Sequence, residues 1–229
     1  MKTSATLISQ TARLTQLLRV CTASLALGLP AVLPPAAHAD DVIPPPVPSI
    51  IQVPAGNTAF LVGHATGTQD YICLPAGAGF AWTFFGPQAT LFNDDDKQII
   101  THFLSPNPIE SGTPRATWQH SRDTSAVWAK AIATATSVSD PTFVAAGAIP
   151  WLLLQVVGSA SGPTGGAALT PITFIHRLST AGGVAPSTGC AASTDVGKKS
   201  LVPYMANYFF YKAAQAADHS DDQHADRRD

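Results

Sequence analysis

Turn-forming residues interrupt this chain about every ten residues, and that spacing limits the fold more than any other feature. Between the turns, the residues fit strands with two faces. In Thr58 to Ala65, Phe60, Val62 and His64 would share one face of a strand that we expect to end on Gly67. The turn signals stand at Gly77 and Gly79, Gly86-Pro87, Asn93 to Asp96, Pro106 to Pro108, and Gly112 to Pro114. Short strands joined by tight turns are typical of a β-sandwich or a closed barrel.

The same alternation predicts further strands along the chain. We expect them at residues 69–74, 80–85, 89–92, 98–104, 115–120, 149–157, 171–178 and 204–211. Residues 149–157 are apolar on both faces, which is typical of a strand buried from two sides. Residues 125–136 are rich in alanine and are the one stretch that fits a short helix. The prediction is an all-β protein: a single β-sandwich or barrel-like domain of many short antiparallel strands, with at most one short helix.

The first 39 residues have the pattern of a secretory signal peptide. A basic start with Lys2, Arg13 and Arg19 precedes an apolar stretch at 20–33, and Ala37-His38-Ala39 forms a small-residue cleavage site. Prolines interrupt the apolar stretch, which is too short to span a membrane. We therefore expect an exported protein, periplasmic or extracellular. Beyond the signal peptide we expect a Pro-rich leader at 40–49, a β-domain at 50–212 and a disordered polar tail at 213–229.

The charge balance argues against nucleic acid as a partner. The full chain has 13 basic and 15 acidic side chains, and the three charges in the first 39 residues are all basic. The remainder carries ten basic against fifteen acidic groups, a net charge near −5. A protein that binds nucleic acid needs a basic surface to replace the counterions of the phosphates.

Two cysteines remain once the signal peptide, with Cys21, is removed. Cys73 and Cys190 would then be exposed to an oxidising compartment, where the simplest outcome is a disulfide between them. A free nucleophilic thiol or a metal ligand stays open as the alternative.

A set of motifs resembles a known family. The motifs are His64-Ala-Thr-Gly-Thr-Gln69-Asp-Tyr71-Ile-Cys73, Trp82-Thr-Phe84, Ala89-Thr-Leu91, His102-Phe103, Thr117-Trp118-Gln119, Ala148-Ile-Pro-Trp151, Thr180 to Pro186 with Cys190, and Tyr204 to Tyr211. They are similar to domain-of-unknown-function family 3455, a group of small secreted bacterial and fungal proteins. The resemblance covers residues 50–212 and implies the domain boundaries and the cysteine pair, but no reaction. Some fungal relatives are labelled malate dehydrogenases; here no G-x-G-x-x-G follows a strand to bind a dinucleotide.

The residues best suited to bind a small molecule are aromatic side chains with polar atoms and side chains that form directed hydrogen bonds. The candidate ligand-binding residues are His64, Gln69, Tyr71, Trp118, Gln119 and His120. The alternative for Trp118 is a place in the core beside Trp82 and Trp151.

Histidines are the residues most suited to metal binding or catalysis in this sequence. His64, His102 and His120 are weak candidates for a metal site with Asp70 or Asp123, because no H-x-H or H-E-x-x-H spacing assembles their imidazoles in advance. Residues 120–125 contain the residue types of a hydrolase triad, but neighbours along a chain do not form one, and no G-x-S-x-G is present. No catalytic residue can be assigned.

Three functions remain. The first is a secreted, disulfide-stabilised, non-catalytic β-domain that binds a small ligand or a surface component. The second is a metal-dependent or other extracytoplasmic enzyme that uses clustered histidines, and the third is a structural envelope protein without a specific ligand. We predict no cofactor, no nucleic-acid partner and no membrane span, and the sequence indicates no oligomeric state.

Overall fold

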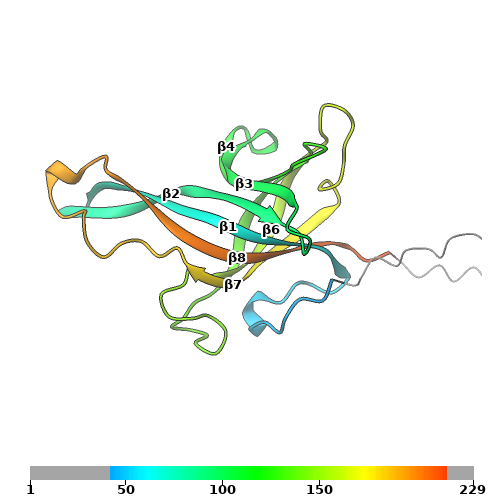
Figure 1. Ribbon diagram of the computed structural model, residues 1–229, viewed down its shortest axis with the longest axis horizontal. Coiled ribbons are helices and arrows are strands. Elements are labelled where there is room, and N and C mark those ends of the chain that lie inside the picture. Colours follow the sequence, from blue (N-terminus) through cyan, green and yellow to red (C-terminus); the bar gives the residue numbers. More distant parts are fainter. Residues whose placement is uncertain (1–41, 216–229) are drawn as a thin grey trace, which may run out of the picture. The chain divides into compact units, whose positions relative to one another are not determined.

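The computed structural model describes residues 42–215 (Figure 1). The predicted signal peptide, the first two residues of the predicted leader and residues 216–229 of the predicted tail lie outside them. The described strands are β1 (Asn57–Ala76), β2 (Gly79–Phe92), β3 (Gln98–Asn107), β4 (Thr113–His120), β5 (Ala126–Ala135), β6 (Trp151–Ala160), β7 (Ile172–Gly182) and β8 (Lys199–Ala213). Three-residue 3-10 helices occur at η1 (Ser49–Ile51), η2 (Pro108–Glu110) and η3 (Ser193–Asp195).

The strands form a closed antiparallel barrel in chain order. Each strand pairs with the next, and β8 returns to pair with β1 along most of its length, from Asn57 opposite Ala213 to Ile72 opposite Lys199. Every strand therefore has a neighbour on both sides, although β2 and β3 pair only over Ala89–Phe92 and Gln98–His102. The all-β prediction is therefore confirmed, and of its two versions the barrel is right and the sandwich is wrong.

The short helix expected at residues 125–136 is wrong, because this stretch is strand β5. Alanine favours helices in isolation, but β5 fills the position between β4 and β6 in the barrel. Val127 and Ala129 are buried in the barrel core. Tertiary pairing thus overrides the local preference of the alanines.

Two of the expected chain breaks also lie inside strands. β1 runs through Gly67, and β2 runs through Gly86-Pro87. A side chain at Gly67 would collide with the backbone of Gln88 and Ala89 on β2, so this glycine permits a close approach of two strands rather than a turn. Gly86 lies opposite Asp70, where the register of β1 and β2 shifts at a bulge.

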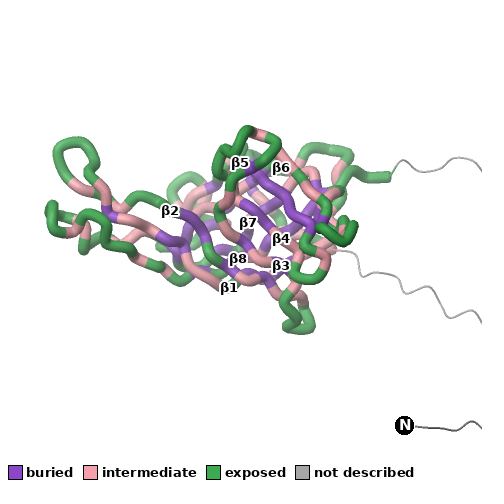
Figure 2. Tube along the Cα trace, turned by 90° about the horizontal axis from the view of Figure 1, so that it is seen from above, coloured by how far each residue is buried: buried purple, intermediate pink, exposed green. Residues whose placement is uncertain are grey.

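Hydrophobic side chains gather in two clusters. The first fills the barrel interior and includes Leu91, Ile100, Trp118, Ile175 and Phe210. The second lies around the opposite-facing side chains of β6, β7 and β8, with Trp151, Leu153 and Phe209. Figure 2 shows the buried residues along the barrel strands and exposed residues at the loops. The burial of β6 on two sides, as expected for residues 149–157, follows from these two clusters.

The segment before β1 packs on the second cluster. Ile51 is fully buried, and Val42, Val47 and Val53 contact the cluster. The His176 Nε2 atom lies 2.6 Å from the Ile51 carbonyl oxygen, to which it donates, and its Nδ1 atom lies 2.9 Å from the Tyr211 hydroxyl. Burial lowers the pKa of His176. This histidine therefore fixes the segment to the barrel as a structural hydrogen-bonding group.

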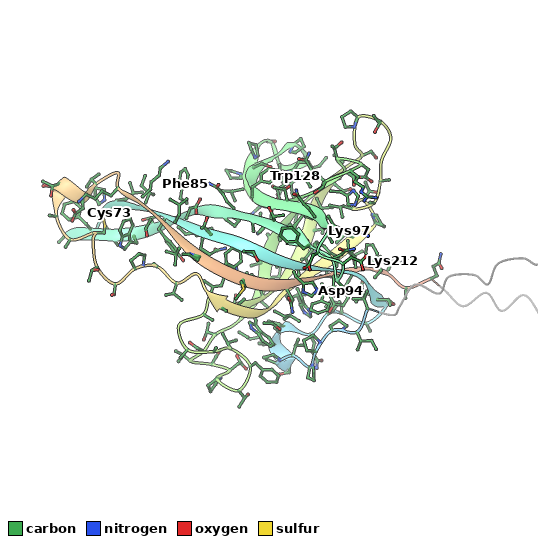
Figure 3. The ribbon with its side chains drawn as sticks, in the orientation of Figure 1. Cys73, Phe85, Asp94, Lys97, Trp128 and Lys212 are labelled. Carbon is green, nitrogen blue, oxygen red and sulfur yellow. A yellow bond between two sulfur atoms is a disulfide. The ribbon has the colours of Figure 1, made fainter. Side chains whose placement is uncertain are left out.

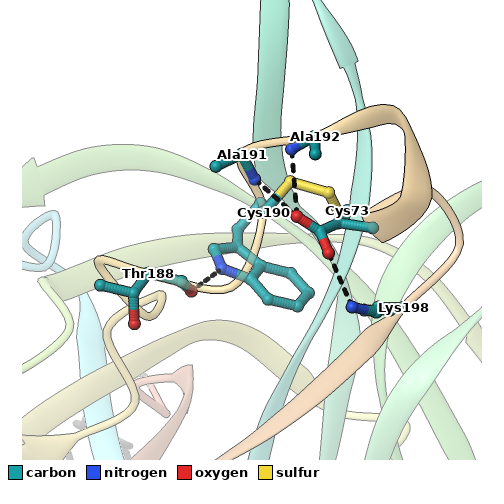
Figure 4. The surroundings of a disulfide bond; sticks show 8 residues. Cys73, Thr188, Cys190, Ala191, Ala192 and Lys198 are labelled. Atoms are coloured by element: carbon teal, nitrogen blue, oxygen red, sulfur yellow. Dashed lines mark hydrogen bonds and ion pairs between the residues drawn. A yellow bond between two sulfur atoms is a disulfide. The ribbon is translucent and has the colours of Figure 1, made fainter.

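The disulfide joins the far end of β1 to the loop between β7 and β8 (Figure 4). Cys73 and Cys190 have Cα atoms 5.5 Å apart and are separated by 117 positions in the chain. The Trp82 indole N–H donates to the Thr188 carbonyl at 2.8 Å. Asp195 accepts hydrogen bonds from the Lys198 ammonium and from the backbone N–H groups of Ala191 and Ala192, and these lower its pKa to about 2. The disulfide and the Trp82 hydrogen bond thus hold the loop to the β1–β2 hairpin, whereas the Asp195 hydrogen bonds lie within the loop itself.

Residues 42–215 contain no helix of the length and apolar character that a membrane crossing requires.

Candidate functional site

A cavity of about 320 Å³ lies inside the barrel and is lined by residues from all eight strands. Its polar and charged lining residues are Gln69, His102, Arg115, Trp118, Lys130, Arg177 and Tyr208. Its apolar lining residues are Phe84, Pro87, Leu104, Pro114, Ala116, Ala129, Ala131, Leu152 and Leu154. A mainly apolar wall with a few polar groups is the usual composition of a small-molecule site.

Strand alternation and small side chains create this space. His102 and Leu104 on β3 are two positions apart and so point to the same side of the sheet, as do the corresponding pairs on β4, β5 and β6. Ala116 on β4 lies opposite Ala129 on β5 in the strand register. Because these facing positions hold methyl groups instead of larger side chains, the interior is not filled at this level.

His102 is a neutral, fixed member of the cavity wall. Its Nδ1 atom donates to the Thr117 carbonyl at 2.8 Å, so in the neutral ring Nε2 carries the lone pair. The ring stacks on Trp118 with centroids 4.2 Å apart and meets Tyr208 edge-on at 5.1 Å. Burial lowers the pKa of His102 to about 3, and the positive charge of Arg177 adds to this effect.

Arg177 brings a positive charge to the cavity. Its Nε and Nη2 atoms donate to the Pro150 carbonyl at 3.0 and 2.9 Å. Burial raises the pKa of Tyr204 and Tyr208, and the guanidinium opposes that rise in both. Among the described residues no carboxylate forms an ion pair with Arg177. The charge is therefore bound by a carbonyl oxygen but not neutralised by an acid.

Two residues of the lining carry buried N–H groups without a hydrogen-bond partner. They are the Gln69 amide nitrogen Nε2 and the Trp118 indole nitrogen Nε1. An unpaired buried donor costs about 1–3 kcal/mol, so such groups are uncommon in a protein interior. Two other buried polar atoms, Asp70 Oδ1 and Trp151 Nε1, are also unpaired but belong to residues outside this lining.

The barrel wall opens beside the cavity where β3 separates from β2. Their pairing ends at Ala89 and His102, although both strands continue with their other neighbours. A second cavity of about 720 Å³ lies at this separation and shares Pro87, His102 and Leu104 with the interior cavity. The two cavities thus adjoin at the point where the two strands diverge. Figure 3 labels Phe85, a lining residue of the second cavity, on β2.

The structure brings two of the six candidate ligand-binding residues to this cavity, Gln69 and Trp118. Trp118 is part of the barrel core, as its alternative interpretation expected, but it does not lie beside the other two tryptophans. Trp151 belongs to the second cluster, and Trp82 donates to the β7–β8 loop. Tyr71 donates to the Gly183 carbonyl at 2.8 Å. Gln119 and His120 stand at the end of β4, away from the cavity lining.

His64 is held elsewhere, with Nδ1 at 2.9 Å from Asn207 Oδ1 and Nε2 at 2.9 Å from Asp94 Oδ1. The Asn207 hydrogen bond is the largest effect that raises the pKa of His64, and Asp94 adds to it. His64, His102 and His120 lie in separate surroundings. In the part of the chain that the structure describes, no three His, Cys, Asp or Glu side chains form a group able to hold a metal ion.

Residues 120–125, which contain the residue types of a hydrolase triad, form a local hydrogen-bonded network at the end of β4. His120 Nδ1 lies 3.1 Å from Asp123 Oδ1, and the Ser125 hydroxyl donates to that same carboxylate at 2.7 Å. Burial raises the pKa of Asp123, but hydrogen bonds from the Ala168 N–H and from Ser125 outweigh it and lower the pKa to about 2. Because Ser125 donates to the carboxylate rather than to the imidazole, the three residues do not form a nucleophile–base pair.

Sequence reasoning did not single out Arg177 or Tyr208 for the site, and it considered His102 only as a metal ligand. The available signal was Arg177 itself, the one residue with a permanent charge in the predicted strand at 171–178. A charged residue at such a position is uncommon in a protein interior and therefore marks a candidate site.

The comparison with protein families gives one match. The profile of a family described as "Protein of unknown function (DUF3455)" matches residues 54–212, and the chain belongs to this family. The resemblance drawn from the motifs is therefore confirmed. Neither a search of the curated proteins nor a search of the solved structures found a match.

Proposed function

We propose that this member of the DUF3455 family is an exported protein that binds a small molecule in the interior cavity and does not transform it. The observation that carries the proposal is the composition of that cavity. An apolar wall holds two buried N–H groups without partners and an arginine without an acid. A ligand that accepts hydrogen bonds would supply the interactions that these groups lack.

Export is supported by the signal-peptide pattern and by the disulfide. A disulfide persists in an oxidising compartment and is rare in the cytosol of mesophiles. The bond between Cys73 and Cys190 closes a loop that contains most of the barrel, and it holds the β7–β8 loop to the β1–β2 hairpin. We therefore assign the folded domain to the periplasm or the extracellular space.

A non-catalytic role is supported by the state of the polar groups. The imidazole of His102 is neutral and fixed by Thr117, and its low pKa makes it a poor proton acceptor at neutral pH. Ser125 is fully buried, with its hydroxyl bound to Asp123. The histidines are spread over different surroundings, which gives the enzyme hypothesis no common centre.

The test is a cavity-filling substitution in the protein that starts at residue 40. Ala116→Leu adds three carbons at a half-buried position of the cavity lining, whereas Ala81→Leu adds the same group at an exposed β2 position outside it. A library of small apolar acids, amides and alcohols is screened by thermal shift, and hits are measured by calorimetry. We expect ligands of the unsubstituted protein to bind the Ala81 variant equally and the Ala116 variant at least tenfold more weakly.

Circular dichroism establishes that both variants keep the β-barrel. Equal binding to the Ala116→Leu variant would place the ligand elsewhere, and the absence of any ligand would favour the structural envelope protein.

A further inference from the structure

We propose that the ligand of the interior cavity is a small carboxylate with a compact apolar body, and that Arg177 binds its carboxylate. This inference rests on the proposed function and names the class of molecule that the site takes.

The charge of the cavity wall favours an anion. Its charged lining residues are Arg115, Lys130 and Arg177, and no Asp or Glu is among the lining residues. This local excess of positive charge contrasts with a net charge near −5 for residues 40–229. Glu110 pairs with Arg115 at 2.7 and 2.8 Å, so that positive charge is already neutralised from outside the lining.

Arg177 is the charged group best placed for recognition. It is half-buried, its Nε and Nη2 atoms donate to one neutral carbonyl, and its guanidinium lies close enough to the Tyr208 hydroxyl to oppose the rise that burial causes in the pKa of that group. The guanidinium has five N–H hydrogens, so donors on Nη1 and Nη2 remain for a ligand. Planar guanidinium groups match carboxylates in geometry, and such charge-assisted hydrogen bonds are stronger than those between neutral groups. A charge of this kind in a poorly solvated site favours an acidic partner.

The uncharged polar groups favour the same class of ligand. Gln69 Nε2 and Trp118 Nε1 are both donors. Trp118 Nε1 has no partner, and Gln69 Nε2 has none of good geometry, although Gln69 lies close enough to the Tyr204 hydroxyl to oppose the rise that burial causes in the pKa of that group. The Tyr208 hydroxyl lies 3.2 Å from that of Tyr204, so one of the two can donate to a further acceptor. A carboxylate has four acceptor positions and no donor. It therefore fits the donor-rich lining better than an alcohol or an amine does.

The rest of the lining sets the size and character of the ligand body. The cavity of about 320 Å³ lies at the small end of ligand sites, and Leu104, Leu152 and Leu154 contribute aliphatic surface to it. An aromatic ring or a short branched chain would bury its apolar surface there. Inorganic phosphate or sulfate would gain nothing from these side chains.

The experiment compares matched probes that differ in one functional group. Hexanoate, benzoate and 3-phenylpropanoate are titrated into the protein that starts at residue 40, each beside its primary amide and the corresponding primary amine. We expect at least one carboxylate to bind at least tenfold more tightly than its amide, and the amine not to bind. Arg177→Met should lower the affinity for that carboxylate at least tenfold and leave the affinity for the amide unchanged. Arg122→Met, at an exposed arginine outside the lining, should change neither.

The comparison of carboxylate, amide and amine on the unsubstituted protein tests whether the ligand is a carboxylate even if the Arg177 variant does not fold. Amides that bind as tightly as the carboxylates would overturn the assignment of an anion and leave the binding function in place. An amine that binds more tightly than its carboxylate would also overturn the assignment of an anion. If neither these probes nor the wider library bind, the proposed function itself fails.

Discussion

His102 links the cavity to the pH dependence of stability. Its pKa is about 3 in the folded protein, because the ring is buried and close to Arg177, and about 6.5 in an unfolded chain. Between these values the unfolded state binds a proton that the folded state does not, so stability is fully present above pH 6.5 and falls as the pH falls toward 3. His176, whose pKa burial also lowers, acts in the same direction.

We therefore expect acidification from pH 7.5 to 5.5 to lower the free energy of unfolding by about 1 kcal/mol through His102, and by a further amount through His176. Urea unfolding at the two pH values measures the change. His102→Asn should remove about 1 kcal/mol of this change, whereas His64→Gln, at a half-exposed histidine whose pKa is raised, should not reduce it. If the His102 variant keeps the full pH dependence, that histidine is not held neutral in the core.

At the scale of strands and loops, the disulfide holds the β7–β8 loop in place. In the chain-entropy description, closing a loop of this length stabilises the fold by about 5 kcal/mol, and strain commonly reduces the gain. The loop otherwise depends on a few exposed hydrogen bonds, among them that from Trp82 to Thr188. We expect the double variant Cys73→Ala, Cys190→Ala to lose about 2–5 kcal/mol of unfolding free energy.

The barrel itself should survive that loss, because its core lies apart from the disulfide. Proteolysis should then cut first within residues 184–198, while circular dichroism retains the strand signal. A count of free thiols in the denatured, unreduced protein that starts at residue 40 is the control and should give none. Unchanged stability of the double variant would show that the bond does not constrain the loop.

The strands show how far local sequence reasoning reaches. Alternation found the segments at 98–104, 115–120 and 204–211, because a strand with one buried face leaves a two-residue pattern. Local reasoning wrongly ended a strand at Gly67, where the glycine allows β1 and β2 to approach each other closely. It also missed strand β5, because alanine has no preference for strands. Both errors arise where a neighbouring strand, distant in sequence, determines the conformation.

At the scale of the whole domain, closure of the barrel explains why the site could be predicted only in part. Gln69 and Trp118 were recognisable as residue types suited to binding, but Arg177 and Tyr208 join them only because β8 pairs with both β7 and β1. No local pattern contains that information. The cavity depends equally on Ala116 and Ala129 facing one another, a relation between strands rather than within one.

The central claim is that a small molecule binds inside the barrel against Trp118, and the most direct measurement is a ¹H–¹⁵N spectrum of the indole groups. The chain has four tryptophans, so four indole signals are expected, and Trp118→Phe identifies the one of interest. On titration with the tightest carboxylate, the Trp118 signal should move downfield as its unpaired N–H gains an acceptor. The Trp82 and Trp128 signals, whose N–H groups already donate to Thr188 and Ser105, should move much less. An unchanged Trp118 signal at saturating ligand would contradict binding at this cavity.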